Sequence, residues 1–145
     1  MIEKYTQGYY IPNISRLAEV ILKELDVPAE VDIQPLKIKT SNAISYVEGY
    51  ASKYTPSEKA KYTIFIDTEI LKMDELSDPM INLLIHEIWH IRQMECGWLR
   101  ANTEYTVAVW NGIHFPMTIP HDKRPWEIEA RMMEEKYFSH IKELI

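Results

Sequence analysis

The stretch LLIHEIWHIRQM, residues 83–94, decides how the rest of the sequence is interpreted. It holds an H-E-x-x-H pentapeptide, with His86, Glu87 and His90, inside an almost continuously apolar run. Residues four apart on a helix share a face, so a helix here would direct two imidazoles towards one ion. Glu87 would stand beside that ion and act on a water molecule without being a ligand. The pattern is typical of helices that carry the zinc ligands and general base of hydrolases.

The ends of this helix are also marked in the sequence. Asp78 is a suitable N-cap, Pro79 suits the first helical position and Gly97 is a suitable stop, which predicts one helix over 79–96, about 27 Å long. Its side chains are apolar almost all round, which indicates a position at the centre of the core. The alternative is a pair of core histidines bonded to backbone, with Glu87 reaching solvent. Burying these three polar groups without a ligand is costly, which favours the metal interpretation.

Length and composition predict one soluble globular domain over residues 1–145. The net charge is −6 and the basic residues are scattered, which argues against nucleic-acid binding. The sole cysteine, Cys96, cannot form an intrachain disulfide and fits a reducing cytoplasm. No secretory signal is recognised at the N-terminus, and the best candidate for a membrane span carries the H-E-x-x-H residues at its centre. We therefore expect a cytoplasmic protein without membrane contacts.

The remaining sequence predicts an α+β fold. Ahead of the motif we expect a helix over 13–26, an extended piece over 31–38 broken at Pro35, strands over 43–51 and 62–66 around a loop at 53–59, and a helical turn over 68–73. The strand at 61–66 would bind a peptide by strand addition if it lay at the sheet edge, although its tyrosine and isoleucines serve equally well as core. Behind the motif we expect a hairpin of 103–110 and 113–115 around Asn111-Gly112, and a last helix over 125–142. A small antiparallel or mixed sheet would then support the motif helix.

A catalytic zinc site needs a third protein ligand, with the fourth position left to water. The downstream candidates are His114, His121, Glu127, Glu129 and His140. On the last helix, Glu129 and Glu127 lie at opposite margins of the apolar stripe that would face the core. Periodicity favours Glu129 by a small margin, because Glu127 lies beside Arg131 and Glu134, where a solvated charge is easier to explain.

Three further motifs follow in a fixed order: Arg92-Gln93, Trp110-Asn111-Gly112, and PWEIEA at Pro125 to Ala130. With the H-E-x-x-H helix they resemble small, phage-associated metallopeptidases, and the glutamate followed by alanine resembles the gluzincins. The resemblance covers about a third of the chain, from His86 to Arg131, and no part before residue 77. It implies a minimal zincin domain, a zinc site of His86, His90 and Glu129, a peptide or protein substrate, and the host cytoplasm if the chain is phage-encoded.

The function expected from these residues is zinc-dependent peptide hydrolysis. Glu87 would take a proton from the attacking water and pass it to the leaving amine. The donor that stabilises the oxyanion is left open among Tyr105, His114, His121 and Tyr137. The groups that accept the second ring N–H of each histidine are left open among Asp67, Asn111 and Asp122. A non-catalytic zincin scaffold with a structural metal is the main alternative. A di-iron protein would need a second Glu-x-x-His pair, which the sequence lacks.

Overall fold

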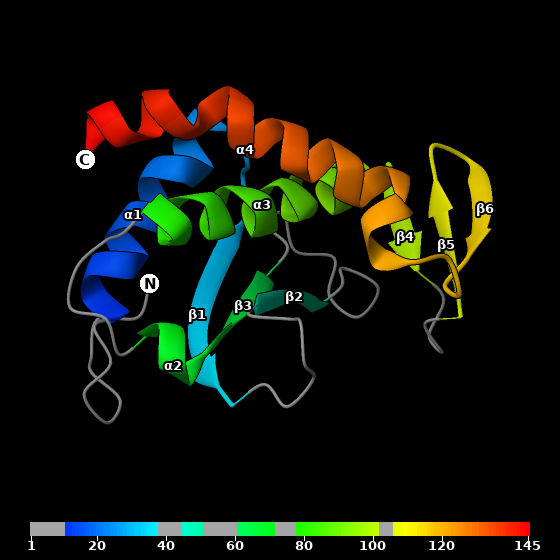
Figure 1. Cartoon of the computed structure of the whole chain (residues 1–145), viewed down its shortest axis with the longest axis horizontal. Helices are drawn as coiled ribbons and strands as arrows, with labels where there is room; N and C mark the ends of the chain where they lie inside the picture. The colour runs from blue at the N-terminus through cyan, green and yellow to red at the C-terminus, as the bar shows by residue number, and fades with distance from the viewer. Residues whose placement is uncertain (1–10, 38–44, 51–60, 72–77, 102–105) are drawn as a thin grey trace.

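The computed structural model describes residues 11–37, 45–50, 61–71, 78–101 and 106–145, and within them the chain is a mixed α+β protein with two small sheets (Figure 1). The first sheet contains β1 (Glu30–Leu36), β2 (Ser45–Tyr50) and β3 (Lys61–Asp67) in the order β1-β3-β2. β1 pairs with β3 in parallel and β2 pairs with β3 antiparallel. β3 is therefore the central strand of the described sheet and β1 and β2 are its outer strands, so the edge position that strand addition to residues 61–66 would require is not met.

The register of this sheet explains how it tolerates a proline. Ile33 and Ile64 face each other at the centre of the β1–β3 pair, and both are fully buried. Pro35 pairs with Ile66 without ending the strand, contrary to the break expected there. A proline is accepted in an outer strand because the missing N–H can lie on the side away from the neighbour.

Helix α3 (Asp78–Glu95) is the motif helix, and it begins and ends within one residue of the prediction. It ends in a Schellman motif: Gly97 has a φ of 75°, its N–H donates to Met94 O at 3.0 Å, and the N–H of Trp98 donates to Gln93 O at 2.9 Å. Its buried side chains lie on most of its circumference, which places the helix within the core as expected.

Two further helices pack around α3. Helix α1 (Ile11–Glu24) and helix α4 (Pro125–Leu144) contact α3 and each other, and α4 runs antiparallel beside α3 (Figure 1). The short helix α2 (Thr68–Leu71) follows β3 directly. The main core lies between these helices and the β1–β3–β2 sheet. Arg92 links two helices, because its Nη1 donates to the carbonyls of Leu25 and Asp26 beyond the end of α1, at 2.8 Å each.

The second sheet contains β4 (Leu99–Ala101), β5 (Val107–Trp110) and β6 (Ile113–Pro116), all antiparallel. The hairpin turn is the predicted one: Asn111 and Gly112 both have positive φ, 50° and 82°, as a type I′ turn requires. β4 was not predicted, because three residues are too few to show an alternating pattern. Trp110 packs with Trp126 in a second small core, which fixes the start of α4 beside the sheet.

The predicted loop at 53–59 lies outside the described residues. None of the described helices has the length and apolar content that a membrane crossing requires.

Candidate metal centre

Helix α3 brings the two motif histidines together. His86 and His90 stand one turn apart, with ring centroids 4.7 Å apart and the ring planes almost perpendicular. Their Nε2 atoms are 3.1 Å from each other. His90 is buried and His86 retains partial exposure, so the pair has one open side. Helical periodicity accounts for the two imidazoles sharing one face of α3, as the sequence predicted.

A carboxylate from α4 completes the group. Glu127 Oε1 lies 2.8 Å from His86 Nε2 and 3.1 Å from His90 Nε2. The three donor atoms thus form a triangle with edges of 2.8, 3.1 and 3.1 Å. Ligands of a tetrahedral zinc ion with bonds of about 2.0–2.1 Å are separated by about 3.3 Å, so the triangle is close to one face of such a tetrahedron. Of the described side chains, His86, His90 and Glu127 are the group that could hold a metal ion.

The third member of this group corrects the expectation of Glu129. Glu129 points to the other side of α3, where its Oε1 accepts hydrogen bonds from Trp89 Nε1 at 2.7 Å and Gln93 Nε2 at 3.2 Å. Both glutamates border the apolar stripe of α4, as predicted. Periodicity identified the stripe but not which of its margins faces the histidines, because that depends on how α4 is rotated against α3. The packing of Trp126 in the second core contributes to that rotation.

The second ring nitrogens of both histidines have partners that the sequence did not indicate. His86 Nδ1 lies 2.8 Å from Glu134 Oε2, and His90 Nδ1 lies 2.8 Å from Gln93 Oε1. These replace Asp67, Asn111 and Asp122, which were the expected candidates. With Nδ1–H donating outward, Nε2 is the nitrogen of each ring that would present its lone pair to an ion once the proton on it is displaced. Glu134 stands two turns after Glu127, a spacing that places both carboxylates on one face of α4 and was visible in the sequence.

The orientation of the Gln93 amide is fixed by its other neighbours. Its Nε2 donates to Trp126 O at 3.0 Å and to Glu129 Oε1 at 3.2 Å. The amide oxygen is therefore the atom that accepts from His90 Nδ1. Glu129 thus supports the ring of His90 through Gln93.

Replacing Gln93 by Leu should weaken metal binding about tenfold, because loss of such an outer partner frees the ligand ring to rotate and to change tautomer. Competition with a chromophoric chelator would measure this affinity. Gln34→Leu, at an exposed position in β1, is the matched control and should leave the affinity unchanged. Equal affinities in the two variants would show that Gln93 does not position His90.

Glu87 lies beside the group and outside it. It is 5% exposed, and its Oε2 accepts a hydrogen bond of 2.6 Å from Ser45 Oγ. Ser45 is the first residue of the outer strand β2, so the contact joins the motif helix to the sheet edge. Sequence reasoning did not identify Ser45, because a lone serine at a strand end carries no distinctive pattern. Glu87 is therefore oriented by the protein while remaining next to the two imidazoles.

The close packing of these groups alters their protonation. Burial alone would lower the pKa of His86, but its hydrogen bonds to Glu127 and Glu134 outweigh burial and raise the pKa to about 9. For His90, burial again acts to lower the pKa, and the contact with Glu127 raises it. For Glu127, burial acts to raise the pKa, and the contacts with the two imidazoles hold it well below its usual range. An arriving cation therefore finds an ionised carboxylate and must displace protons from the imidazoles.

This protonation gives the metal-free protein a pH-dependent stability. The pKa of His86 is about 9 in the folded protein, against 6.5 for an unperturbed histidine. Protonated His86 therefore adds its full contribution to the free energy of unfolding below pH 6.5, and this contribution is lost as the pH rises through about 9. The shift corresponds to about 3 kcal/mol. Urea unfolding in the presence of a chelator, from pH 6 to pH 9.5, should show this decline. A flat profile, or a profile in His86→Gln that declines as steeply, would contradict it.

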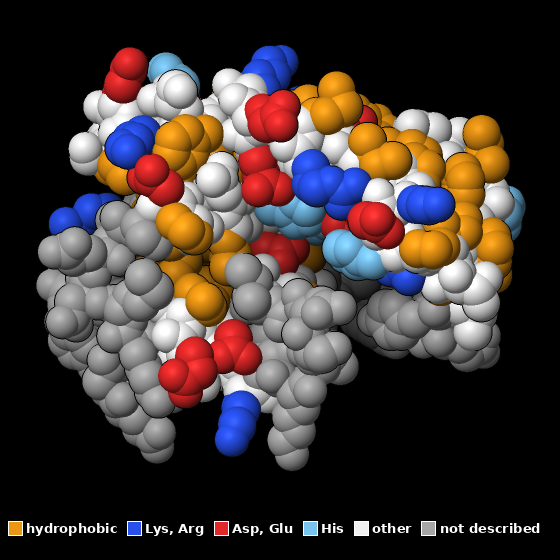
Figure 2. Space-filling model, in the orientation of Figure 1, with side chains coloured by type: hydrophobic (Ala, Val, Ile, Leu, Met, Phe, Trp, Pro, Cys, Tyr) orange, Lys and Arg blue, Asp and Glu red, His pale blue; other side chains and the backbone are white. Residues whose placement is uncertain are grey.

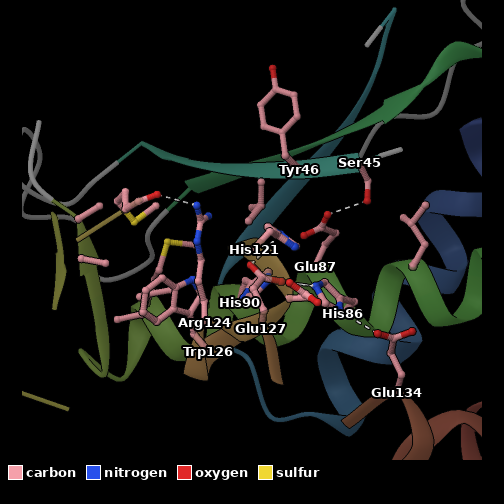
Figure 3. Close-up of a pocket in the computed structure, with 18 of the residues that line it drawn as sticks. Ser45, Tyr46, His86, Glu87, His90, His121, Arg124, Trp126, Glu127 and Glu134 are labelled. Atoms are coloured by element: carbon pink, nitrogen blue, oxygen red, sulfur yellow. Dashed lines mark hydrogen bonds and ion pairs between the residues drawn. The ribbon is translucent and has the colours of Figure 1, made fainter. Parts of the chain in front are cut away.

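A pocket of about 1220 Å³ opens over the group. Figure 2 shows histidine and carboxylate side chains within a recess of the surface, and Figure 3 shows Glu87 between Ser45 of β2 and the cluster of His86, His90 and Glu127. Ser45, Tyr46 and Val47 of β2 line the pocket, and so do the apolar side chains of Met94, Leu99, Ala108, Met117 and Trp126.

The remaining sequence candidates are dispersed. His121 lines the pocket, whereas His114 is exposed on β6 and Tyr137 packs against the main core. His140 lies 3.3 Å from Glu24, away from the cluster. Tyr105 lies outside the described residues.

Comparison of the chain with protein-family models, with curated protein sequences and with solved structures finds no match.

Proposed function

We propose that the protein is a zinc-dependent peptidase with His86, His90 and Glu127 as the metal ligands and Glu87 as the general base. The observation that carries the proposal is the convergence of two imidazole nitrogens and one carboxylate oxygen beside a fourth, non-ligating carboxylate at the wall of a pocket. Two histidines and a glutamate are a common ligand set of catalytic zinc. The arrangement of α3 beneath an outer strand, with a glutamate supplied by a later helix, is also what a minimal zincin would have.

The residues around the cluster fit a bound cation. When bound, zinc would act as a Lewis acid, activating a water molecule and polarising a carbonyl group. Glu87, held by Ser45, would accept a proton from the attacking water and then deliver it to the leaving amine. Glu134 and Gln93 would keep the two imidazoles in the tautomer that presents Nε2 to the ion.

The pocket suits a peptide as substrate. β2 is an outer strand of its sheet and lines the pocket, so an extended peptide could bind alongside it by strand addition. The apolar side chains that line the pocket offer contacts for a bulky substrate side chain. In this proposal β2 takes the peptide-binding role that the sequence suggested for the strand at 61–66.

The alternative is a scaffold protein with a structural metal. Structural zinc sites have four protein ligands, whereas the group found among the described residues has three and faces a pocket. Glu87 would also have no task in a structural site. Both features favour catalysis.

The proposal is tested by metal content and hydrolysis measured together. Elemental mass spectrometry should find about one zinc per chain after reconstitution, and the loaded protein should cleave members of a fluorogenic peptide library. Removal of the metal with a chelator should abolish cleavage, and readdition should restore it. No metal after reconstitution would reject the site; metal without any cleavage would reject the peptidase and favour the scaffold.

A further inference from the structure

Arg124 is a cation that the backbone holds at the pocket over the metal cluster. It follows the short 3₁₀ helix η1 (His121–Lys123) and precedes helix α4, and its partly buried side chain lines the pocket. Its Nε donates to Ile119 O at 3.0 Å, and its Nη2 donates to Met117 O at 2.9 Å. Figure 3 shows one of these bonds at the guanidinium end of the Arg124 side chain. The two bonds fix the plane of the guanidinium.

This guanidinium keeps hydrogen-bonding capacity that the described residues do not use. The two carbonyls leave both hydrogens of Nη1 and the second hydrogen of Nη2 without a described acceptor. Within the described part of the chain, no carboxylate lies within ion-pair distance of Arg124. A carbonyl accepts a hydrogen bond but does not neutralise the charge. Arg124 is therefore an oriented cation without a counter-ion among these residues.

The carboxylates of the pocket are held mainly at the metal cluster. Glu127 and Glu134 contact the imidazoles, and Glu87 accepts a hydrogen bond from a serine of β2. In the view of Figure 3, the cluster lies between Glu134 and Arg124. Asp122 also lines the pocket, but it is exposed and forms no ion pair with the described side chains. The pocket therefore combines a site for a metal ion with a separate positive charge.

A second arginine, Arg100 of β4, lines the same pocket. It is exposed, and the described side chains give it no carboxylate partner. The protein as a whole has a net charge of −6, so its overall field repels an acidic ligand. Two arginines without such partners on one pocket create a local positive region, which attracts a negative group at short range.

We propose that Arg124 binds a carboxylate of the substrate and makes the protein selective for peptides with a carboxylate near the cleaved bond, an inference that rests on the proposed function. The oxygens of a carboxylate match the planar array of guanidinium N–H groups, and hydrogen bonds between charged groups are stronger than neutral ones. The N–H of Glu127 donates to Arg124 O at 3.0 Å, so the main chain fixes this cation relative to the metal ligand. An acidic side chain and the C-terminus of a peptide both present the required group.

Binding of labelled peptides tests the proposal without requiring cleavage. One set is alanine-based, capped at both ends, and carries Glu at each position in turn; a matched set carries Gln, and a further set has the Gln peptides with a free C-terminus. Fluorescence anisotropy with the zinc-loaded Glu87→Gln protein, which should bind peptides without turning them over, gives the dissociation constants. A carboxylate in the favoured position should strengthen binding about tenfold over the capped Gln peptide. Tighter binding of the Glu peptides identifies an acidic side chain as the source, and tighter binding of the uncapped Gln peptides identifies the C-terminus.

Arg124→Gln, made in the same background, should bind all sets equally, at the affinity that the background protein shows for the capped Gln peptides. The amide N–H of the new side chain can still donate to one of the two carbonyls, which limits damage to the segment. Arg16→Gln is the matched control, because it removes the same charge at an exposed position of α1 outside the pocket. It should keep the preference of about tenfold.

Equal affinity for all sets in the background protein would overturn the proposal, and so would a preference for a carboxylate that survives in Arg124→Gln. Affinities that fall together for all sets in Arg124→Gln would also overturn it, because Arg124 would then only support the pocket wall. If the zinc-loaded protein cleaves no peptide, the proposed function fails, while the peptide comparison still decides whether Arg124 binds a carboxylate.

Discussion

Replacing Glu127 by Ala should remove most of the metal affinity. Structural zinc sites with four protein ligands bind the ion with a free energy of roughly 10–16 kcal/mol, which is about 2.5–4 kcal/mol for each ligand. Loss of one ligand should therefore weaken zinc binding on the order of 10²–10³-fold. The two imidazoles would also lose the carboxylate that both now contact at 2.8 and 3.1 Å. Zinc per chain, measured by elemental mass spectrometry after dialysis at low free zinc, should fall from about one to near zero.

Glu129→Ala is the matched control, because it removes the same side chain two residues further along α4. Its carboxylate accepts from Trp89 and Gln93 and does not contact either imidazole nitrogen facing the cluster. We expect zinc content near one per chain, because Gln93 keeps its bond to Trp126 O and so its orientation towards His90. The unfolding free energy should fall by about 1–3 kcal/mol, since Trp89 and Gln93 each lose an acceptor. Zinc lost in Glu129→Ala and kept in Glu127→Ala would reverse the assignment of the third ligand.

Replacing Glu87 by Gln should abolish most hydrolysis and leave the metal in place. The amide oxygen of Gln can still accept the hydrogen bond from Ser45, so the local packing is preserved. A glutamine cannot accept the proton from water, and loss of a general base typically costs 10²–10⁴-fold in rate. Initial rates of peptide cleavage and zinc content should be measured on the same preparation.

Glu135→Gln is the control for this variant, because it makes the same change at an exposed position of α4. It should keep both zinc and activity. A Glu87→Gln protein with undiminished activity would place the base elsewhere. A Glu87→Gln protein that loses zinc would make Glu87 a support of the metal site.

Much of the fold could be predicted because its signals are local. The helix at 79–96 has a cap, a stop and a continuous apolar pattern, and the Asn111-Gly112 turn has residues that accept positive φ. Sheet order is not local: whether β3 lies at the centre or the edge depends on pairing between distant segments. β1 was expected to break at Pro35, and its outer position, which the sequence does not reveal, explains why it continues.

The same contrast between local signals and contacts of distant segments applies to the residues of the site. His86, Glu87 and His90 were predicted because four-residue spacing on one helix fixes their relation. Glu127, by contrast, reaches them from another helix, and the choice between the two margins of α4 requires the rotation of that helix about its axis. The contact of Ser45 with Glu87 depends on the position of a strand end, which no spacing in the sequence specifies.

Helix α4 places Glu127 and Glu134 against the ring of His86. Its Glu129 supports the ring of His90 through Gln93. Under the proposed function, metal binding and the docking of this helix would therefore be thermodynamically linked. An ion at a free concentration of a thousand times its dissociation constant would add about 4 kcal/mol to the free energy of unfolding. A chelator would then act on this protein as a mild denaturant, and the melting temperature would serve as a gauge of available zinc.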